Sequence, residues 1–178
     1  LMSSTEILHR GLDEMEKSCF EAAAADFREV LRREPENLVA RNNLAVALKK
    51  QGQLDAALAE YQKAIAVSPH KAELHNNLAS TYMAKGNFDL ALKSFYQAIH
   101  LNPDYASPRY NLAHVLYLKG NYDGAIEQYQ EALRLQPRSS IIHRDLGDAL
   151  FAAGQYQQSI IEYRAAERLQ DNSVQLLV

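Results

Sequence analysis

The side chains best suited to catalysis or metal binding are six histidines and one cysteine, and their spacing favours neither activity. The histidines are His9, His70, His75, His100, His114 and His143. No His-Glu-x-x-His pattern and no phosphate-binding glycine-rich loop occurs. Cys19 is the only cysteine of the sequence, so it can form neither a disulfide within it nor a cysteine-based metal site. We therefore expect no catalytic residue, no metal site and no cofactor.

The composition is that of an ordinary folded protein without an excess of basic charge. The sequence has 178 residues, of which 47% are hydrophobic and 23% charged, as is normal for a soluble domain. A net charge of −3 argues against a nucleic-acid or anionic-membrane surface, because those partners require concentrated basic charge. No apolar run reaches the roughly 18–20 residues of a membrane span, and residues 1–16 lack the pattern of a signal peptide. We expect a cytoplasmic protein without direct membrane insertion.

Two residue types share one period along the chain. Prolines recur every 34 residues, at Pro35, Pro69, Pro103 and Pro137. Glycines recur at the same interval, at Gly52, Gly86, Gly120 and Gly154. A fixed period of this length is the signature of a repeat architecture. With proline at position 32, residues 1–178 form a single array whose repeats span about 4–37, 38–71, 72–105, 106–139 and 140–173.

Each repeat has the pattern of a helical hairpin. Apolar residues fall at helical spacing on two stripes, and the glycine at position 15 separates the stripes. Glycine permits the left-handed conformation that ends a helix, and proline at position 32 stops the second helix. In the inner repeats the first helix, helix A, is expected at roughly 38–51, 72–85 and 106–119. The second helix, helix B, is expected at roughly 54–67, 88–101 and 122–135.

The pattern resembles the tetratricopeptide repeat family over roughly residues 4–173. Small residues occupy positions 8, 20 and 27, and position 24 is aromatic throughout: Phe27, Tyr61, Phe95, Tyr129 and Tyr163. The resemblance implies an all-α fold, a right-handed superhelical solenoid of about five helix-turn-helix repeats, with helix A on its concave side. The outer repeats depart from the pattern, with Arg10 for leucine, Ser18 for glycine and Asp171 for proline. Residues 174–178 resemble the start of a capping helix.

Position 6 of helix A lies opposite the core stripe, and three repeats place asparagine there: Asn43, Asn77 and Asn111. An amide side chain both donates and accepts hydrogen bonds, so a row of them can hold an extended peptide by its backbone. The row is similar to the asparagine ladder in the tetratricopeptide region of O-linked N-acetylglucosamine transferases. Two alternatives stay open: the asparagines bond between adjacent helices, or they were copied by repeat duplication.

Other residues of the same helix A surface complete the predicted peptide-binding site. They are Asn42, Lys50, Asn76, Tyr110, His114, Tyr117, Arg144 and Phe151. The aromatic members and His114 are the best candidates for a side-chain pocket, because aromatic side chains anchor interfaces. Their alternative role is packing between helices. A carboxylate clamp like that of heat-shock co-chaperones is not expected, since Lys50 and Arg144 lie too far apart in the array.

The leading functional interpretation is a protein–protein interaction scaffold that binds an extended partner segment in the concave groove. A second is self-assembly, through the ends of the solenoid or the apolar tail at 176–178. A third is the recognition region of a larger enzyme. The sequence does not identify the partner, because one repeat fold serves many functions.

Overall fold

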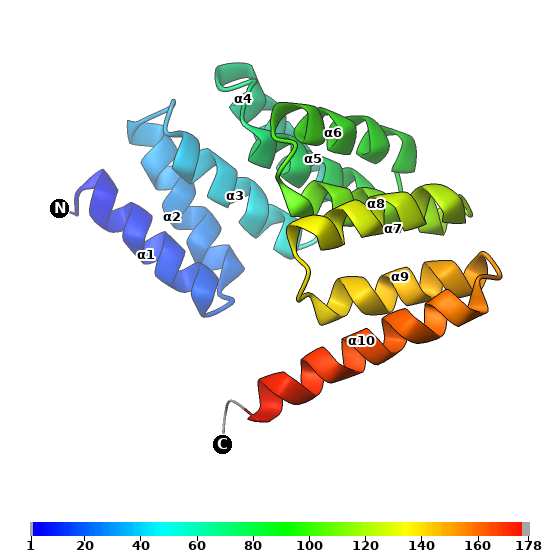
Figure 1. Cartoon of the computed structure of the whole chain (residues 1–178). Coiled ribbons are helices and arrows are strands. Elements are labelled where there is room, and N and C mark those ends of the chain that lie inside the picture. Colours follow the sequence, from blue (N-terminus) through cyan, green and yellow to red (C-terminus); the bar gives the residue numbers. More distant parts are fainter. Residues whose placement is uncertain (1, 176–178) are drawn as a thin grey trace. The chain divides into compact units, whose positions relative to one another are not determined.

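The computed structural model describes residues 2–175, with side chains as far as Gln170, and every regular element in that range is an α-helix (Figure 1). In chain order the helices are α1 (Ser4–Glu16), α2 (Phe20–Arg33), α3 (Leu38–Lys50), α4 (Leu54–Val67), α5 (Ala72–Ala84), α6 (Phe88–Leu101), α7 (Ala106–Leu118), α8 (Tyr122–Leu135), α9 (Ser140–Ala152) and α10 (Tyr156–Gln175). The predicted all-α repeat fold is confirmed.

The chain divides into two compact units, residues 1–94 and 95–178, and the boundary falls inside α6. In the first unit, α1 to α5 pack consecutively, each helix on the next. In the second unit, α7 to α10 do the same. Each unit is therefore built from helical hairpins stacked in chain order, and the continuity of all five repeats as one array stays a prediction.

Glycine and proline set the helix boundaries where the sequence predicted them. Helix A ends one residue earlier than expected in each inner repeat, and helix B has the expected bounds. The four periodic glycines follow helix A with φ between 75° and 80°, which is the left-handed conformation that glycine adopts without steric cost. Ser18 takes the same place in the first repeat with φ 60°.

Position 4 of helix A has a structural role that the sequence did not reveal. In four repeats its side chain reaches the carbonyl oxygen of the proline that precedes the helix. His75 Nε2 lies 2.8 Å from the Pro69 oxygen, and His143 Nε2 lies 3.2 Å from the Pro137 oxygen. Arg41 and Arg109 make the equivalent contacts to Pro35 and Pro103. The bonds satisfy carbonyl groups that helix B cannot reach.

Each unit has a core of small residues and one aromatic ring per repeat. In the first unit, Phe27 and Tyr61 are at most 1% exposed, and alanines surround them. In the second unit, Tyr129 is 1% exposed, and Leu146 and Ile126 are also buried. Gly11 lies so close to Phe27 that a Cβ would be 2.8 Å from the ring. The small residue at position 8 therefore makes room for the aromatic residue at position 24.

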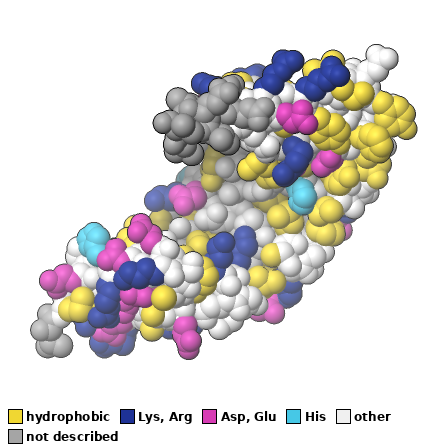
Figure 2. Space-filling model, turned by 90° about the horizontal axis from the view of Figure 1, so that it is seen from below, with side chains coloured by type: hydrophobic (Ala, Val, Ile, Leu, Met, Phe, Trp, Pro, Cys, Tyr) yellow, Lys and Arg dark blue, Asp and Glu magenta, His cyan; other side chains and the backbone are white. Residues whose placement is uncertain are grey.

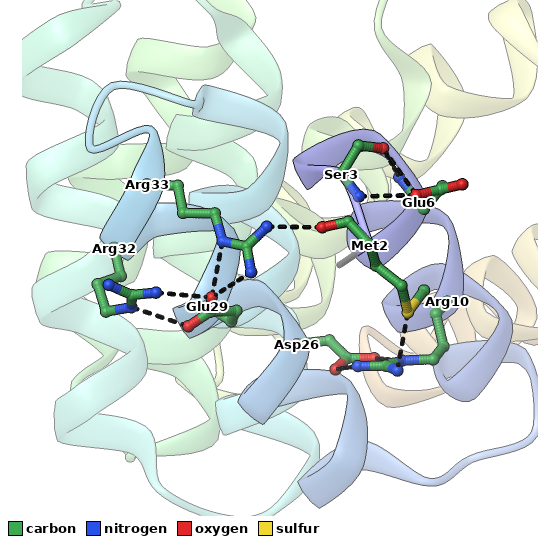
Figure 3. A network of polar contacts seen from close by, with 8 residues as sticks. All are labelled: Met2, Ser3, Glu6, Arg10, Asp26, Glu29, Arg32 and Arg33. Carbon is green, nitrogen blue, oxygen red and sulfur yellow. Dashed lines mark hydrogen bonds and ion pairs between the residues drawn. The ribbon is translucent and has the colours of Figure 1, made fainter.

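Polar contacts replace apolar ones in the first repeat (Figure 3). Arg10, where other repeats have leucine, donates two hydrogen bonds to Asp26 on α2, at 2.8 and 2.5 Å. Glu29 accepts from Arg32 and Arg33, and Arg33 also donates to the Met2 carbonyl at 2.8 Å. These contacts join α1 and Met2 to α2.

The C-terminal prediction needs a correction. A new helix A was expected to begin at residue 174, but residues 174 and 175 continue α10, which has 20 residues against 14 in each preceding helix B. Asp171 stands where the other repeats have proline, and it keeps the backbone N–H that a helix requires. Residues 176–178 of the predicted capping helix lie outside the described residues.

Candidate peptide-binding surface

The asparagines of the first unit make a contact between successive helices A. Asn77 Nδ2 on α5 donates to Asn42 Oδ1 on α3 at 3.2 Å. Asn43 Nδ2 donates to the Val39 carbonyl of its own helix at 2.9 Å. All three side chains are half-buried. Helix-to-helix bonding, one of the alternatives to peptide binding, is therefore real for Asn42 and Asn77.

These bonds do not use the full capacity of the amides. An asparagine side chain has two N–H donors and a carbonyl oxygen with two acceptor sites. Within the described residues, the Asn43 side chain makes one such bond, to the Val39 carbonyl. Its amide can donate a second hydrogen bond and accept others while its bond to the Val39 carbonyl stays intact.

A hollow of about 290 Å³ opens beside these residues in the first unit. We call it the asparagine hollow, and it is lined by Leu38, Val39, Asn42, Asn43, Lys71, Glu73 and Leu74. Its residues come from the N-terminal halves of α3 and α5 and from the residue before α5. Val39 is 53% exposed, so an apolar side chain already faces solvent at its edge.

The two remaining asparagines of the predicted site, Asn76 and Asn111, are placed less favourably for binding a peptide together with Asn43 and Asn77. Asn76 is only 7% exposed, which leaves little surface for a ligand. Asn111 is half-buried on α7, in the second unit, whereas Asn43 and Asn77 belong to the first. A continuous ladder of three asparagines stays a prediction.

The second unit gathers four of the predicted residues around one pocket of about 220 Å³. We call it the tyrosine pocket, and it is lined by Tyr110, His114, Tyr117, Tyr129, Arg144, Asp145 and Asp148. The first three project from α7, Tyr129 from α8, and the last three from α9. Asp145, Asp148 and Tyr129 also line the pocket, although they were not among the predicted site residues.

Hydrogen bonds hold the pocket walls together. The Tyr110 hydroxyl donates to Asp145 Oδ2 at 2.6 Å. Tyr110 is at position 5 of its repeat and Asp145 at position 6 of the next, as Asn42 and Asn77 are in the first unit. Arg144 Nε donates to Asp145 Oδ1 at 3.0 Å. The Tyr163 hydroxyl on α10 donates to Asp148 Oδ1 at 2.7 Å. The Tyr110 and Tyr129 rings lie 5.8 Å apart at 54°.

Burial and the neighbouring aspartates raise the pKa of two tyrosines of the pocket. Burial, and next its hydrogen bond to Asp145, raise the pKa of Tyr110 to about 12. Burial raises the pKa of Tyr129 as well, and the negative charges of Asp145 and Asp148 raise it further. Both tyrosines are therefore uncharged at physiological pH, and the hydroxyl proton of Tyr110 is held in its hydrogen bond to Asp145.

Five predicted residues line neither hollow: Asn76, Asn77, Asn111, Lys50 and Phe151. Phe151 is 59% exposed, and its ring contacts Tyr156 at 5.3 Å, so it belongs to the turn between α9 and α10. Lys50 is exposed at the C-terminal end of α3, whereas the asparagine hollow is at the other end. Figure 2 shows hydrophobic side chains gathered towards the right of the view.

Among the described residues, no three histidine, cysteine, aspartate or glutamate side chains are close enough together to bind a metal ion. Within the same part of the chain, no helix is long and apolar enough to cross a membrane.

Helical hairpins of one length, stacked in chain order and with polar and aromatic residues on helix A, define a helical-repeat protein of the protein-interaction class. The chain belongs to the tetratricopeptide repeat family. Models described as tetratricopeptide repeat match residues 15–62, 70–138 and 110–174, and one described as TPR repeat matches residues 47–86.

The fold is similar to solved structures of MamA proteins. One MamA crystal structure is 22% identical, with a TM-score of 0.80 over 97% of this chain and 94% of the other. MamA from residue 41 onward of Desulfovibrio magneticus RS-1 is 16% identical, with a TM-score of 0.84 over 95% and 96% of the two chains. At these identities the likeness concerns the fold alone. No curated protein sequence matches this chain.

Proposed function

We propose that the protein is a protein–protein interaction scaffold, and that it binds an extended segment of its partner on the helix A surface. The observation that carries the proposal is the tyrosine pocket. Tyr110, His114, Tyr117 and Arg144 were predicted from their positions alone, and they line one hollow in the second unit. Aromatic and arginine side chains are the residues that most often anchor protein interfaces.

The asparagine hollow supports the same proposal in the first unit. The bond from Asn77 positions the Asn42 side chain, and Asn43 retains both an N–H donor and an acceptor. Amides that are fixed in place lose less entropy when a ligand binds than amides that must be ordered first. A peptide backbone on this surface would therefore find preorganised partners.

The family supports a binding role rather than catalysis, because tetratricopeptide repeats typically act as non-catalytic scaffolds. We propose that the protein acts without a cofactor, in the cytoplasm and on protein rather than nucleic-acid partners. The net charge of −3 and the single cysteine support this part of the proposal.

The test is partner capture from a native lysate with the full chain and with a variant that combines Asn43→Ala, Asn77→Ala and Asn111→Ala. Alanine is a better helix former than asparagine, so the helices should be retained, and circular dichroism checks this. The control combines Gln97→Ala, Gln130→Ala and Gln157→Ala, which are exposed positions on helices B. Loss of captured partners in the first variant alone is expected. Equal capture by all three proteins would contradict a role for the asparagines.

Self-association is the second candidate, and the exposed end of the second unit favours it. Ile160 on α10 is 49% exposed, whereas Leu58 and Ile126, at the same repeat position, are at most 8% exposed. Ile161 beside it is 62% exposed. A second copy could cover this apolar surface. We expect Ile160→Ser with Ile161→Ser to abolish any concentration dependence of the mass measured by light scattering, and an unchanged dependence would eliminate this interface.

A further inference from the structure

The charges of the tyrosine pocket do not cancel. Two carboxylates line it, Asp145 and Asp148, against the single guanidinium of Arg144. Arg144 is already bonded to Asp145, at 3.0 Å. Asp148 is exposed, and among the described residues its hydrogen bond is to the neutral Tyr163 hydroxyl. Arg144 also interacts electrostatically with Asp148, but the lining carries two carboxylates against one guanidinium, and the hydrogen bond of that guanidinium is to Asp145.

The other walls are aromatic. Tyr110, Tyr117 and Tyr129 all line the pocket. The face of a phenol ring is electron-rich and attracts a cation placed over it. The same faces are apolar enough to accommodate the methylene groups of a long side chain. A carboxylate beside aromatic faces suits an organic cation with an apolar stem.

We propose that the tyrosine pocket binds an arginine or lysine side chain carried by the bound partner segment. The proposal rests on the proposed function, because it assumes a segment on the helix A surface. It specifies the chemistry of one side chain: the charged end is near Asp148, and the stem lies along the tyrosine rings.

The size of the pocket agrees with one side chain. A volume of about 220 Å³ equals that of about seven water molecules at ~30 Å³ each. That is too little for a helix and enough for the end of a long side chain. An acidic side chain would be repelled, since the two carboxylates of the lining outnumber its one guanidinium, which is paired with Asp145.

The effect of these charges on their neighbours is consistent with a negative pocket. Asp145 and Asp148 add to the effect of burial in raising the pKa of Tyr129. Asp148 likewise adds to the effect of burial in raising the pKa of Tyr163. A field that opposes tyrosinate formation also attracts a cation.

The test uses a blocked heptapeptide, Gly-Ala-Ser-Arg-Ser-Ala-Gly, and the same peptide with citrulline in place of arginine. Citrulline keeps the shape of arginine and removes its charge. Each peptide is titrated into the full chain labelled with nitrogen-15, and amide shifts give the site and the affinity. We expect the arginine peptide to move the amides of Tyr110, His114 and Asp148 and to bind about tenfold more tightly than the citrulline peptide.

Two substitutions should act in opposite directions. Asp148→Asn removes the negative charge of this carboxylate but keeps an oxygen that can accept the hydrogen bond of Tyr163. We expect the arginine and citrulline peptides to bind this variant with nearly equal affinity. Arg144→Gln releases Asp145 and should raise affinity for the arginine peptide about threefold to tenfold. The control is Glu127→Gln, which removes an exposed carboxylate on α8 that does not line the pocket. We expect it to leave the affinities for the arginine peptide and for the citrulline peptide nearly unchanged.

The outcomes separate the inference from the proposed function. Equal binding of the two peptides on helix A, or an arginine effect that maps outside the pocket, would overturn the inference and leave the scaffold function intact. If neither peptide changes the chemical shift of any helix A amide, the inference and the proposed function are both wrong for this class of ligand. An equal loss with Glu127→Gln would also overturn the inference, because it would indicate a general charge effect.

Discussion

Ser18 adopts a backbone conformation that the other repeats assign to glycine. Its φ of 60° is the only positive value at a non-glycine residue in the described chain. A side chain costs roughly 1–2 kcal/mol in this conformation, because its Cβ approaches the carbonyl oxygen. Glycine avoids that cost but loses more conformational entropy on folding.

We therefore expect Ser18→Gly to raise the free energy of unfolding by about 0.5–1 kcal/mol. Urea denaturation followed by circular dichroism measures the change. Gly52→Ala is the matched control, because Gly52 has φ 75° at the same repeat position. It should lower stability by about 1 kcal/mol. A destabilised Ser18→Gly protein would show that the serine side chain contributes more than its backbone costs.

Glu29 is held in its ionised form by two arginines. Hydrogen bonds from Arg32, and next from Arg33, lower the pKa of Glu29 from 4.5 to about 2. Because the pKa in the folded chain is lower than in the unfolded chain, the stabilisation is present above about pH 4.5 and is lost as the pH falls towards 2.

Carbon-13 NMR of the Glu29 carboxyl group measures this directly. We expect a midpoint near pH 2, and a shift towards the ordinary value when Arg32→Gln and Arg33→Gln are combined. A midpoint near 4.5 in the unmodified protein would show that the ion pairs of Figure 3 do not persist in solution.

At the scale of the helices, proline is the signal that ends helix B. The helices before Pro35, Pro69, Pro103 and Pro137 have 14 residues each, and α10, with Asp171 instead, has 20. In the first four repeats, helix B ends two residues before the proline.

Asp171→Pro should therefore shorten α10 to end near residue 169, since proline removes an N–H and its ring collides with the carbonyl four residues earlier. Secondary Cα chemical shifts of residues 170–175 measure the change, and loss of their helical values is expected. Asp171→Ala is the control that keeps the N–H group. Helical shifts retained in the proline variant would mean that another feature sets the end of the preceding helices B.

The helix boundaries were predictable because they depend on local chemistry. Glycine and proline act on their own turn of backbone, so a 34-residue period in both types fixes the hairpins without knowledge of packing. The contacts from position 4 to the proline carbonyl were not predictable. They depend on where an arginine or histidine side chain ends in space, and the family usually has tryptophan at that position.

The site was predictable in part for the same reason. Helical periodicity identified the exposed face, and so Tyr110, His114 and Tyr117 were assigned to one surface. The pairs Asn42–Asn77 and Tyr110–Asp145 are 35 residues apart and join neighbouring helices A. Such pairing requires the packing distance between helices, which a single sequence does not provide.

At the scale of the molecule, each unit contributes its own part of the candidate surface. The first unit offers amides that suit a peptide backbone, and the second offers an acidic aromatic pocket that suits a side chain. Affinity from two such sites on one segment can exceed that of either alone, provided that the segment spans both. A partner that contacts one unit only would bind more weakly.

The central claim is that the partner lies on helix A, and site-specific photo-crosslinking tests it most directly. A benzophenone amino acid is placed at Val39 or Leu118, which are exposed on helices A, and at Ala59 or Glu127, which are exposed on helices B. The two controls share one repeat position, and within the described part of the chain none of the four side chains makes a hydrogen bond or ion pair. After irradiation in native lysate, we predict crosslinks to the same partner from Val39 and Leu118 and none from Ala59 and Glu127. Crosslinks from the helix B positions alone would place the partner on the other face and contradict the account.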